Sequence, residues 1–280
     1  MLLKISQITN IDALKINFST ESLWILNSAL AVIMFGVALG IRVEDFKRLL
    51  KNPKILLAGI FSQFFLLPAL TFIAILIIQP HPSFALGMIL IAACPGGNIS
   101  NFFSKMAKGN AALSVSLTAF ATLTCILMTP LNLQFWGNLY EPTSLILKKV
   151  ELNPYELFKL VSLILGIPLV CGMVIKHYFA SIAVKTEKVL RPFSMLVFLI
   201  LIVAAFSQNL DVFINHIHHL LFLVIFHNIF AFIIGFYTAK AFGLNKKDTK
   251  TISMETGIQN GGLGLLLIFG FFEGLGEWHY

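Results

Sequence analysis

Charged residues are scarce in this chain. They make up 12% of its 280 residues, whereas hydrophobic residues make up 58%, and the mean hydropathy is +0.87. Soluble domains carry about 25% charged residues, so the composition excludes an ordinary soluble domain and indicates a membrane protein. Cysteine is also rare. Cys94, Cys125 and Cys171 lie in apolar runs, and we expect small buried hydrophobic residues rather than a disulfide framework.

The chain also lacks the motifs of common enzyme classes. It has no phosphate-binding loop, no catalytic triad and no zinc-ligand spacing, and the glycines at 261–264 do not follow a strand, as a nucleotide-binding fingerprint would require. An intramembrane enzyme would need paired acids, a Ser–Lys pair or a histidine cluster at membrane depth. We therefore expect neither enzymatic activity nor a cofactor.

Eight apolar stretches are long enough to cross a bilayer. A hydrocarbon core about 30 Å thick needs roughly 20 helical residues. The stretches are 22–41, 54–79, 83–106, 111–133, 155–178, 189–208, 219–242 and 249–275. The sequence therefore predicts an all-α polytopic membrane protein, with a single transmembrane domain over 22–275 after an N-terminal segment, 1–21.

The basic residues mark one side of the membrane. Fifteen of the 20 Lys and Arg residues lie at alternate junctions between the stretches: Arg42, Lys47, Arg48, Lys51 and Lys54; Lys105 and Lys108; Lys176, Lys185, Lys188 and Arg191; and Lys240, Lys246, Lys247 and Lys250. Cytoplasmic loops carry such an excess, so the net charge of +7 indicates orientation rather than nucleic-acid binding. We expect a multi-pass plasma membrane protein, in the inner membrane of a bacterium, with both chain ends outside the cytoplasm.

Two of the stretches contain helix-breaking residues. Pro95-Gly96-Gly97-Asn98 divides the third, and ETGIQNGGLG at 255–264 divides the eighth. One break alone would most simply be a kink. These two occupy matching positions, as the third member of the first three stretches and the third member of the last three, and these two sets of three have opposite orientations in the membrane. Such a pattern is typical of an inverted-repeat transporter with two discontinuous helices crossing near the midplane. A full repeat would need one more helix at each end, and we expect self-association or a separate helix to fill the last position.

Polar groups at the breaks could hold a cation and an anion. Glu255 lies well inside a stretch whose interior offers no Lys or Arg to pair with it. Such a carboxylate indicates a nearby cation, and a protonated structural Glu or a proton-coupled role is the alternative. Oxygen ligands are available from Gln63, Ser100, Asn101, Ser114, Thr118, Gln259 and the carbonyls around Thr256 and Ile258. We expect Ser116 and Thr122 to bond their own helix. Asn98 and Asn260, one in each break, are the expected substrate contacts, because half-helix N-termini suit an anion.

Two long motifs resemble the signature regions of the bile acid:sodium symporter family. They are CPGGNISNFFSKMAKGNAALSVSLTAFATLTCILMTPL, from residue 94, and ETGIQNGGLGLLL, from residue 255; SQFFLLPAL at 62–70 and the pair His227-Asn228 fit the same pattern. The resemblance covers about residues 25–275. It implies a ten-helix fold, or a nine-helix variant without the first helix. The panel domain would hold the stretches 22–41, 155–178 and 189–208, and the core domain the other five.

The resemblance also implies Na⁺-coupled uptake of organic anions, either bile-acid-like or smaller carboxylates. One sodium site would comprise Ser100, Asn101, Ser114, Thr118 and Glu255, and the second Gln63, Glu255, Thr256, Ile258 and Gln259. His227 and Asn228 would join Asn98 and Asn260 at the substrate. A Na⁺-dependent ligand-binding sensor that does not transport, or an inactive fragment, is the alternative, because the chain ends before the family's expected last helix.

Overall fold

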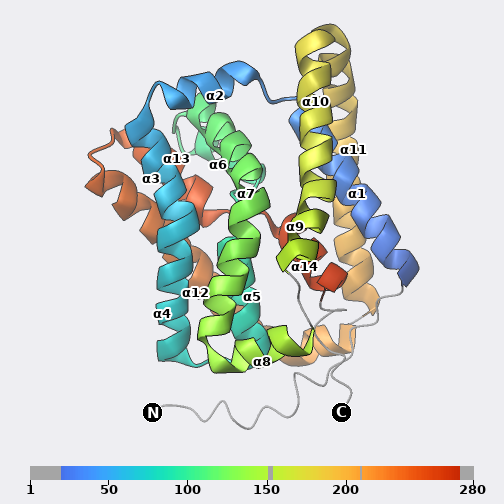
Figure 1. The fold of residues 1–280 in the computed structure, drawn as a ribbon, viewed down its shortest axis with the longest axis vertical. Coiled ribbons are helices and arrows are strands. Elements are labelled where there is room, and N and C mark those ends of the chain that lie inside the picture. Colours follow the sequence, from blue (N-terminus) through green and yellow to red (C-terminus); the bar gives the residue numbers. More distant parts are fainter. Residues whose placement is uncertain (1–19, 151–153, 209, 272–280) are drawn as a thin grey trace.

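The computed structural model describes residues 20–150, 154–208 and 210–271. These ranges consist of helices and the turns between them and contain no β-sheet (Figure 1). The elements are α1 (Thr20–Ala38), α2 (Val43–Leu50), α3 (Pro53–Phe61), the π-helical turn η3 (Ser62–Leu66), α4 (Leu67–Ile78), α5 (Pro82–Ala93), α6 (Ile99–Met106), α7 (Ala111–Leu139), α8 (Glu141–Lys149), α9 (Pro154–Val161), the π-helical turn η4 (Ser162–Gly166), α10 (Ile167–Tyr178), α11 (Ala180–Gln208), α12 (Leu210–Ala241), α13 (Lys246–Gly257) and α14 (Gly261–Phe271).

The prediction of an all-α polytopic membrane protein is confirmed. Four described spans are long and apolar enough to cross a membrane: Pro53–Ile78, Ala111–Leu139, Tyr155–Tyr178 and Leu221–Ala241. The stretch 83–106 is divided into α5 and α6, and the last stretch into α13 and α14, so both predicted breaks separate two helices. Residues 1–19 of the predicted N-terminal segment and 272–275 of the last stretch lie outside the described part of the chain.

Several elements differ from the sequence prediction, including α11 and α12, which begin nine residues before the predicted starts at 189 and 219. Helix α7 continues through Pro130 to Leu139, beyond the predicted end at 133, because a membrane-spanning helix can accommodate a proline. The short helices α2 and α8 were not predicted, since each is too short and too polar to form a spanning stretch. Helix α2 begins after Arg42, whose backbone N–H donates to the Asp45 carboxylate over 2.9 Å.

The turn η3 widens the helix between α3 and α4. Pro68 follows it and has no N–H to donate to the carbonyl of Phe64, four residues earlier. The side-chain amide of Asn132, on α7, donates to that carbonyl over 3.0 Å. Wide turns of this kind often occur at functional sites, and this one leaves Ser62 and Gln63 buried, with 0% and 2% of their surface exposed.

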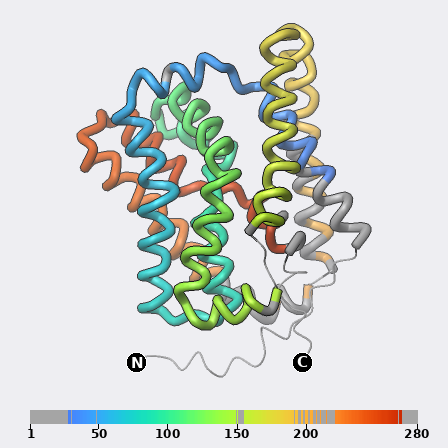
Figure 2. The backbone as a smooth tube through the Cα atoms, in the orientation of Figure 1, coloured from blue at the N-terminus to red at the C-terminus, as the bar shows by residue number. Residues whose placement is uncertain are grey.

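The helices pack in two groups that stand side by side (Figure 1). Helix α1 packs against α10 and α11 in one group, and α12 and α13 pack against each other in the second, which also holds α3 to α7. Figure 2 shows the chain between α13 and α14 passing from the second group to the first, where α14 packs against α1. The largest cluster of buried apolar side chains includes Met34, Ile89, Leu165 and Leu263, so it joins the two groups.

Candidate functional site

The two breaks lie directly against each other. The backbone N–H of Gly97 donates to the carbonyl of Ile258 over 2.7 Å, and the N–H of Asn260 donates to the carbonyl of Pro95 over 2.8 Å. Together they form a short antiparallel bridge and satisfy backbone groups that the breaks release, as membrane depth requires. Glycine is needed at position 97, because a Cβ there would lie 2.8 Å from the opposite backbone.

The structure brings the five residues of the first predicted sodium site together around Glu255. This carboxyl lies near the end of α13 and is only 2% exposed. Its Oε2 accepts hydrogen bonds from the hydroxyls of Ser100 (2.5 Å) and Ser114 (3.2 Å), and its Oε1 accepts one from Thr118 (2.6 Å). The Thr118 hydroxyl also lies 3.2 Å from Oδ1 of Asn101. Helices α6, α7 and α13 thus each present polar side chains to one point.

Oxygen atoms at this point outnumber the protons that could bridge them. Each hydroxyl has one proton and an ionised carboxylate has none. The Thr118 hydroxyl alone faces three acceptors: the Glu255 carboxylate, the Asn101 amide oxygen and the Ser114 carbonyl at 3.0 Å. Within the described residues, no Lys, Arg or His forms an ion pair with Glu255. A hard cation fits such a surplus, because carboxylate, hydroxyl and carbonyl oxygens are its preferred ligands.

The members of the second predicted sodium site other than Glu255 also lie together, at the bridged breaks. The amide Nε2 of Gln63 is 3.1 Å from Oε1 of Gln259 and 3.4 Å from the carbonyl of Cys94. Nε2 of Gln259 donates to the carbonyl of Thr256 over 2.6 Å. The carbonyls of Thr256 and Ile258 each accept one hydrogen bond here, and since a carbonyl has two lone pairs, each could still contact a cation.

The four predicted substrate contacts divide into two pairs. Asn98 and Asn260 lie half-buried at the start of α6 and α14. Oδ1 of Asn260 accepts from the N–H of Leu263 over 3.1 Å, so its amide N–H₂ points away from the helix cap. His227 is buried on α12, with Nε2 2.9 Å from the Thr71 hydroxyl. Asn228 is exposed, and its amide donates to its own helix. No described hydrogen bond joins the second pair to the crossing.

Sequence reasoning missed three polar residues at this site. The Ser62 hydroxyl lies 2.5 Å from the Thr256 hydroxyl, the Ser104 hydroxyl lies 3.1 Å from that of Ser114, and Thr129 donates to the carbonyl of Ala93, at the end of α5, over 2.6 Å. The spacing of four residues between Ser100 and Ser104 places both on one helical face and could have identified Ser104. The other two depend on contacts between distant segments.

Two expectations about single side chains can be checked directly. Ser116 and Thr122 donate to the carbonyls four residues earlier in α7, at 2.9 and 2.8 Å, as predicted. Cys94 and Cys125 are buried, but the prediction was wrong for Cys171, which is exposed on α10. An apolar stretch does not show which of its faces points to lipid, and a small residue is accepted on either.

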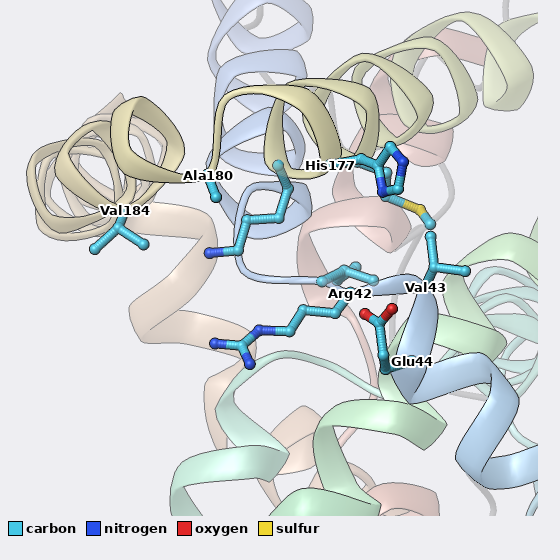
Figure 3. Close-up of a pocket in the computed structure, with 9 residues that line it drawn as sticks. Arg42, Val43, Glu44, His177, Ala180 and Val184 are labelled. Atoms are coloured by element: carbon cyan, nitrogen blue, oxygen red, sulfur yellow. The ribbon is translucent and has the colours of Figure 1, made fainter.

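A cavity of about 230 Å³ lies away from the crossing, where α1 leads into α2 and α10 leads into α11 (Figure 3). It is lined by Ile41, Arg42, Val43, Glu44, Met173, Lys176, His177, Ala180 and Val184. Beside it, Lys176 and Glu187 form an ion pair with an N–O distance of 3.8 Å. None of the predicted sodium or substrate residues lines this cavity.

Comparison with known proteins gives consistent matches. The profile of the Sodium Bile acid symporter family matches residues 28–216. The chain is 30% identical to the uncharacterized sodium-dependent transporter YocS of Bacillus subtilis (strain 168), over 93% of this chain and 80% of that protein. It is 27% identical to the probable sodium/metabolite cotransporter BASS1, chloroplastic, of Arabidopsis thaliana, over 85% of this chain and 57% of that protein. It is 28% identical to sodium/bile acid cotransporter 5 of Rattus norvegicus, over 92% of this chain and 58% of that protein. The chain therefore spans less than two thirds of the length of the last two relatives.

Proposed function

Because the chain belongs to the sodium bile acid symporter family, we propose that it couples the inward movement of Na⁺ to the uptake of a small organic anion. The chain is a multi-pass membrane protein, and its family is one of transporters rather than enzymes. The observation that carries the proposal is the buried Glu255 carboxylate. Helices α6 and α7 surround it with oxygen atoms, and no cationic side chain in the described ranges forms an ion pair with it.

We assign the first Na⁺ site to the oxygens around Glu255, together with Ser100, Asn101, Ser114 and Thr118. The second site would use Gln63, Gln259, Glu255 and the carbonyls of Thr256 and Ile258. The Na⁺ ions are cargo that moves with the substrate, and broken helices supply such carbonyls at membrane depth. Because Glu255 belongs to both sets, its single charge would make binding at one site sensitive to occupation of the other.

The substrate would be a carboxylate bound beside the crossing. The half-helices α6 and α14 begin there, and the N-terminus of a helix carries partial positive charge that favours an anion. Asn98 and Asn260 stand at these starts and would donate amide N–H groups. His227 and Asn228 stay predictions. Uptake measurements distinguish a bile-acid-like anion from a smaller carboxylate.

The place where the basic junctions meet supports one orientation in the membrane. Leu49 of α2, Leu113 of α7 and Ile252 of α13 share one apolar cluster, and the Lys250 ammonium donates to the carbonyl of Ala107 over 2.7 Å. Three basic junctions thus lie at the same end of the molecule, which would face the cytoplasm. We propose this orientation for the chain in the plasma membrane.

Uptake into proteoliposomes tests the proposal. The full chain would be reconstituted with a Na⁺ gradient, and the entry of labelled taurocholate and labelled succinate compared with entry under a choline gradient. We expect Na⁺-dependent entry of one of them that Glu255→Ala abolishes. Na⁺-dependent binding without entry would support the sensor instead. Uptake that follows a proton gradient and ignores Na⁺ would contradict sodium coupling.

A further inference from the structure

A second hydrogen-bonded network ties the turn between α6 and α7 to the first turns of α13. Nδ2 of Asn110 donates to Oδ1 of Asp248 over 2.8 Å, and Nδ2 of Asn245 donates to Oδ2 of the same carboxylate over 2.5 Å. The backbone N–H of Asn110 donates to the Thr251 hydroxyl over 2.8 Å. Asp248 is only 5% exposed. These residues lie at the end of the molecule where the basic junctions meet, and none belongs to the proposed Na⁺ or substrate sites.

Each amide in this network has a fixed orientation. Oδ1 of Asn110 accepts from the backbone N–H of Leu113 over 3.1 Å and caps the start of α7. Oδ1 of Asn245 accepts from the N–H groups of Lys247 and Asp248 at 3.0 Å and caps the start of α13. Both amides therefore direct their nitrogen atoms to Asp248. Since an N-cap bond holds the helix start, the Asp248 carboxylate joins two helix starts through two capping side chains.

The network lies one or two turns from the residues around Glu255. Ser114 follows Asn110 by four residues on α7, and Glu255 follows Asp248 by seven residues on α13, which are about one and two helical turns. Contact between the two segments is close, because a Cβ at Gly109 would lie 2.8 Å from the Thr251 hydroxyl. Any rotation of α7 against α13 would change the distance from the Ser114 and Thr118 hydroxyls to the Glu255 carboxylate.

We infer that Asp248 and Asn110 are positioning residues that set the Na⁺ affinity of the site around Glu255. They hold α7 against α13 at the cytoplasmic end and touch neither Na⁺ nor substrate. The inference rests on the proposed function, because it concerns the affinity of a proposed Na⁺ site. The Asp248–Asn110 bond joins residues 138 apart in sequence. It therefore holds α7 and α13 in a relative position that neither helix could set alone.

Exchanging the two side chains tests this directly. Asp248→Asn places an amide N–H₂ group among amide donors, and Asn110→Asp places two carboxylates face to face, so each single change removes a hydrogen bond to a charged group. The double variant restores every bond. The new carboxylate at position 110 would cap α7 with one oxygen and accept from the new amide at position 248 with the other. The oxygen of that new amide would in turn accept from Asn245. Thr251→Val is a second, uncharged route to weakening the same contact.

The readout is the Na⁺ concentration that gives half of the maximal Na⁺-induced rise in melting temperature, measured on the purified full chain with choline replacing Na⁺. We expect each single change to raise this concentration about three- to tenfold, and the double variant to return it to within about twofold of the unchanged protein. Asp45→Asn is the matched control, because it also neutralises a carboxylate that accepts a hydrogen bond near a helix start at the basic end, and it should leave the concentration unchanged.

The outcomes distinguish a positioning role from a purely structural one. Single and Thr251→Val variants that keep the original Na⁺ concentration would overturn the inference, and so would a double variant no better than the singles. A purely structural role would lower the melting temperature in Na⁺-free buffer without moving the half-maximal concentration. If the unchanged protein itself shows no response to Na⁺, the proposed function fails, and the inference fails with it.

Discussion

Replacing Glu255 by glutamine removes one negative charge from the crossing and keeps the size of the side chain. In the structure the carboxyl is only 2% exposed and accepts hydrogen bonds from three hydroxyls. A buried charge without a counter-ion costs several kcal/mol of the free energy of unfolding. We therefore expect the Glu255→Gln variant to be at least as stable as the unchanged protein in Na⁺-free buffer, even though a buried side chain has been replaced.

Na⁺ should no longer stabilise that variant. Two unit charges about 4 Å apart interact by roughly 4 kcal/mol at an effective dielectric constant of about 20, and this corresponds to about a thousandfold in affinity. A site that responds to millimolar Na⁺ in the unchanged protein would therefore be empty in the variant at any practical concentration. Without Na⁺ the variant should therefore be at least as stable as the unchanged protein. Adding Na⁺ should no longer raise its stability.

Thermal unfolding in detergent measures both effects, with Na⁺ titrated against choline at constant ionic strength. Protons compete with Na⁺ for the same carboxylate, so the half-maximal Na⁺ concentration of the unchanged protein should rise as the pH falls. The variant has no carboxylate at this position, so Na⁺ should have no effect on it at any pH. If the Glu255→Gln protein keeps the full Na⁺ response, Glu255 is a structural side chain and the assignment of the carboxylate to Na⁺ is wrong.

Three further changes test separate parts of the proposal. Gln259→Ala should weaken only the second Na⁺ site, so the response to Na⁺ becomes less steep while a response persists. Asn132→Ala leaves a buried carbonyl of η3 without its donor, and we expect a loss of about 1–3 kcal/mol in the free energy of unfolding; a loss below about 0.5 kcal/mol would contradict this role. In a cysteine-free background, cysteines at Lys51 and Lys247 should react with an impermeant reagent only from the cytoplasmic side, and one at His218 only from the opposite side. Labelling of position 51 from outside intact cells would overturn the orientation.

Much of the fold could be predicted because a bilayer imposes a simple rule on length and polarity. Apolar runs of about 20 residues locate spanning helices. Pro95 and the glycines after Gly257 mark the breaks, because helix-breaking residues are energetically costly at membrane depth unless the released backbone groups are satisfied. Helix α2 could not be predicted by this rule. It is polar, and its one apolar face packs Leu49 against α7 and α13, a contact that depends on tertiary structure.

The residues of the site also divide into those that local sequence patterns predict and those that depend on tertiary contacts. Ser114 and Thr118 share a helical face with the Glu255 carboxylate opposite, and a spacing of four residues is visible in a sequence. Ser62 and Asp248 were missed. Their partners, Thr256 and Asn110, lie 194 and 138 residues away, and a helical period gives the direction of a side chain but not its distant partner. Cys171 was misplaced for a related reason, because periodicity does not identify the lipid-facing side.

Direct binding of radioactive sodium to the purified chain examines the crossing without any knowledge of the substrate. We expect saturable binding of two Na⁺ ions per chain, loss of both in Glu255→Ala, and loss of one in Gln259→Ala. The absence of saturable binding to the unchanged chain, or equal binding to the folded Glu255→Ala variant, would show that the crossing of the two broken helices is not a sodium site.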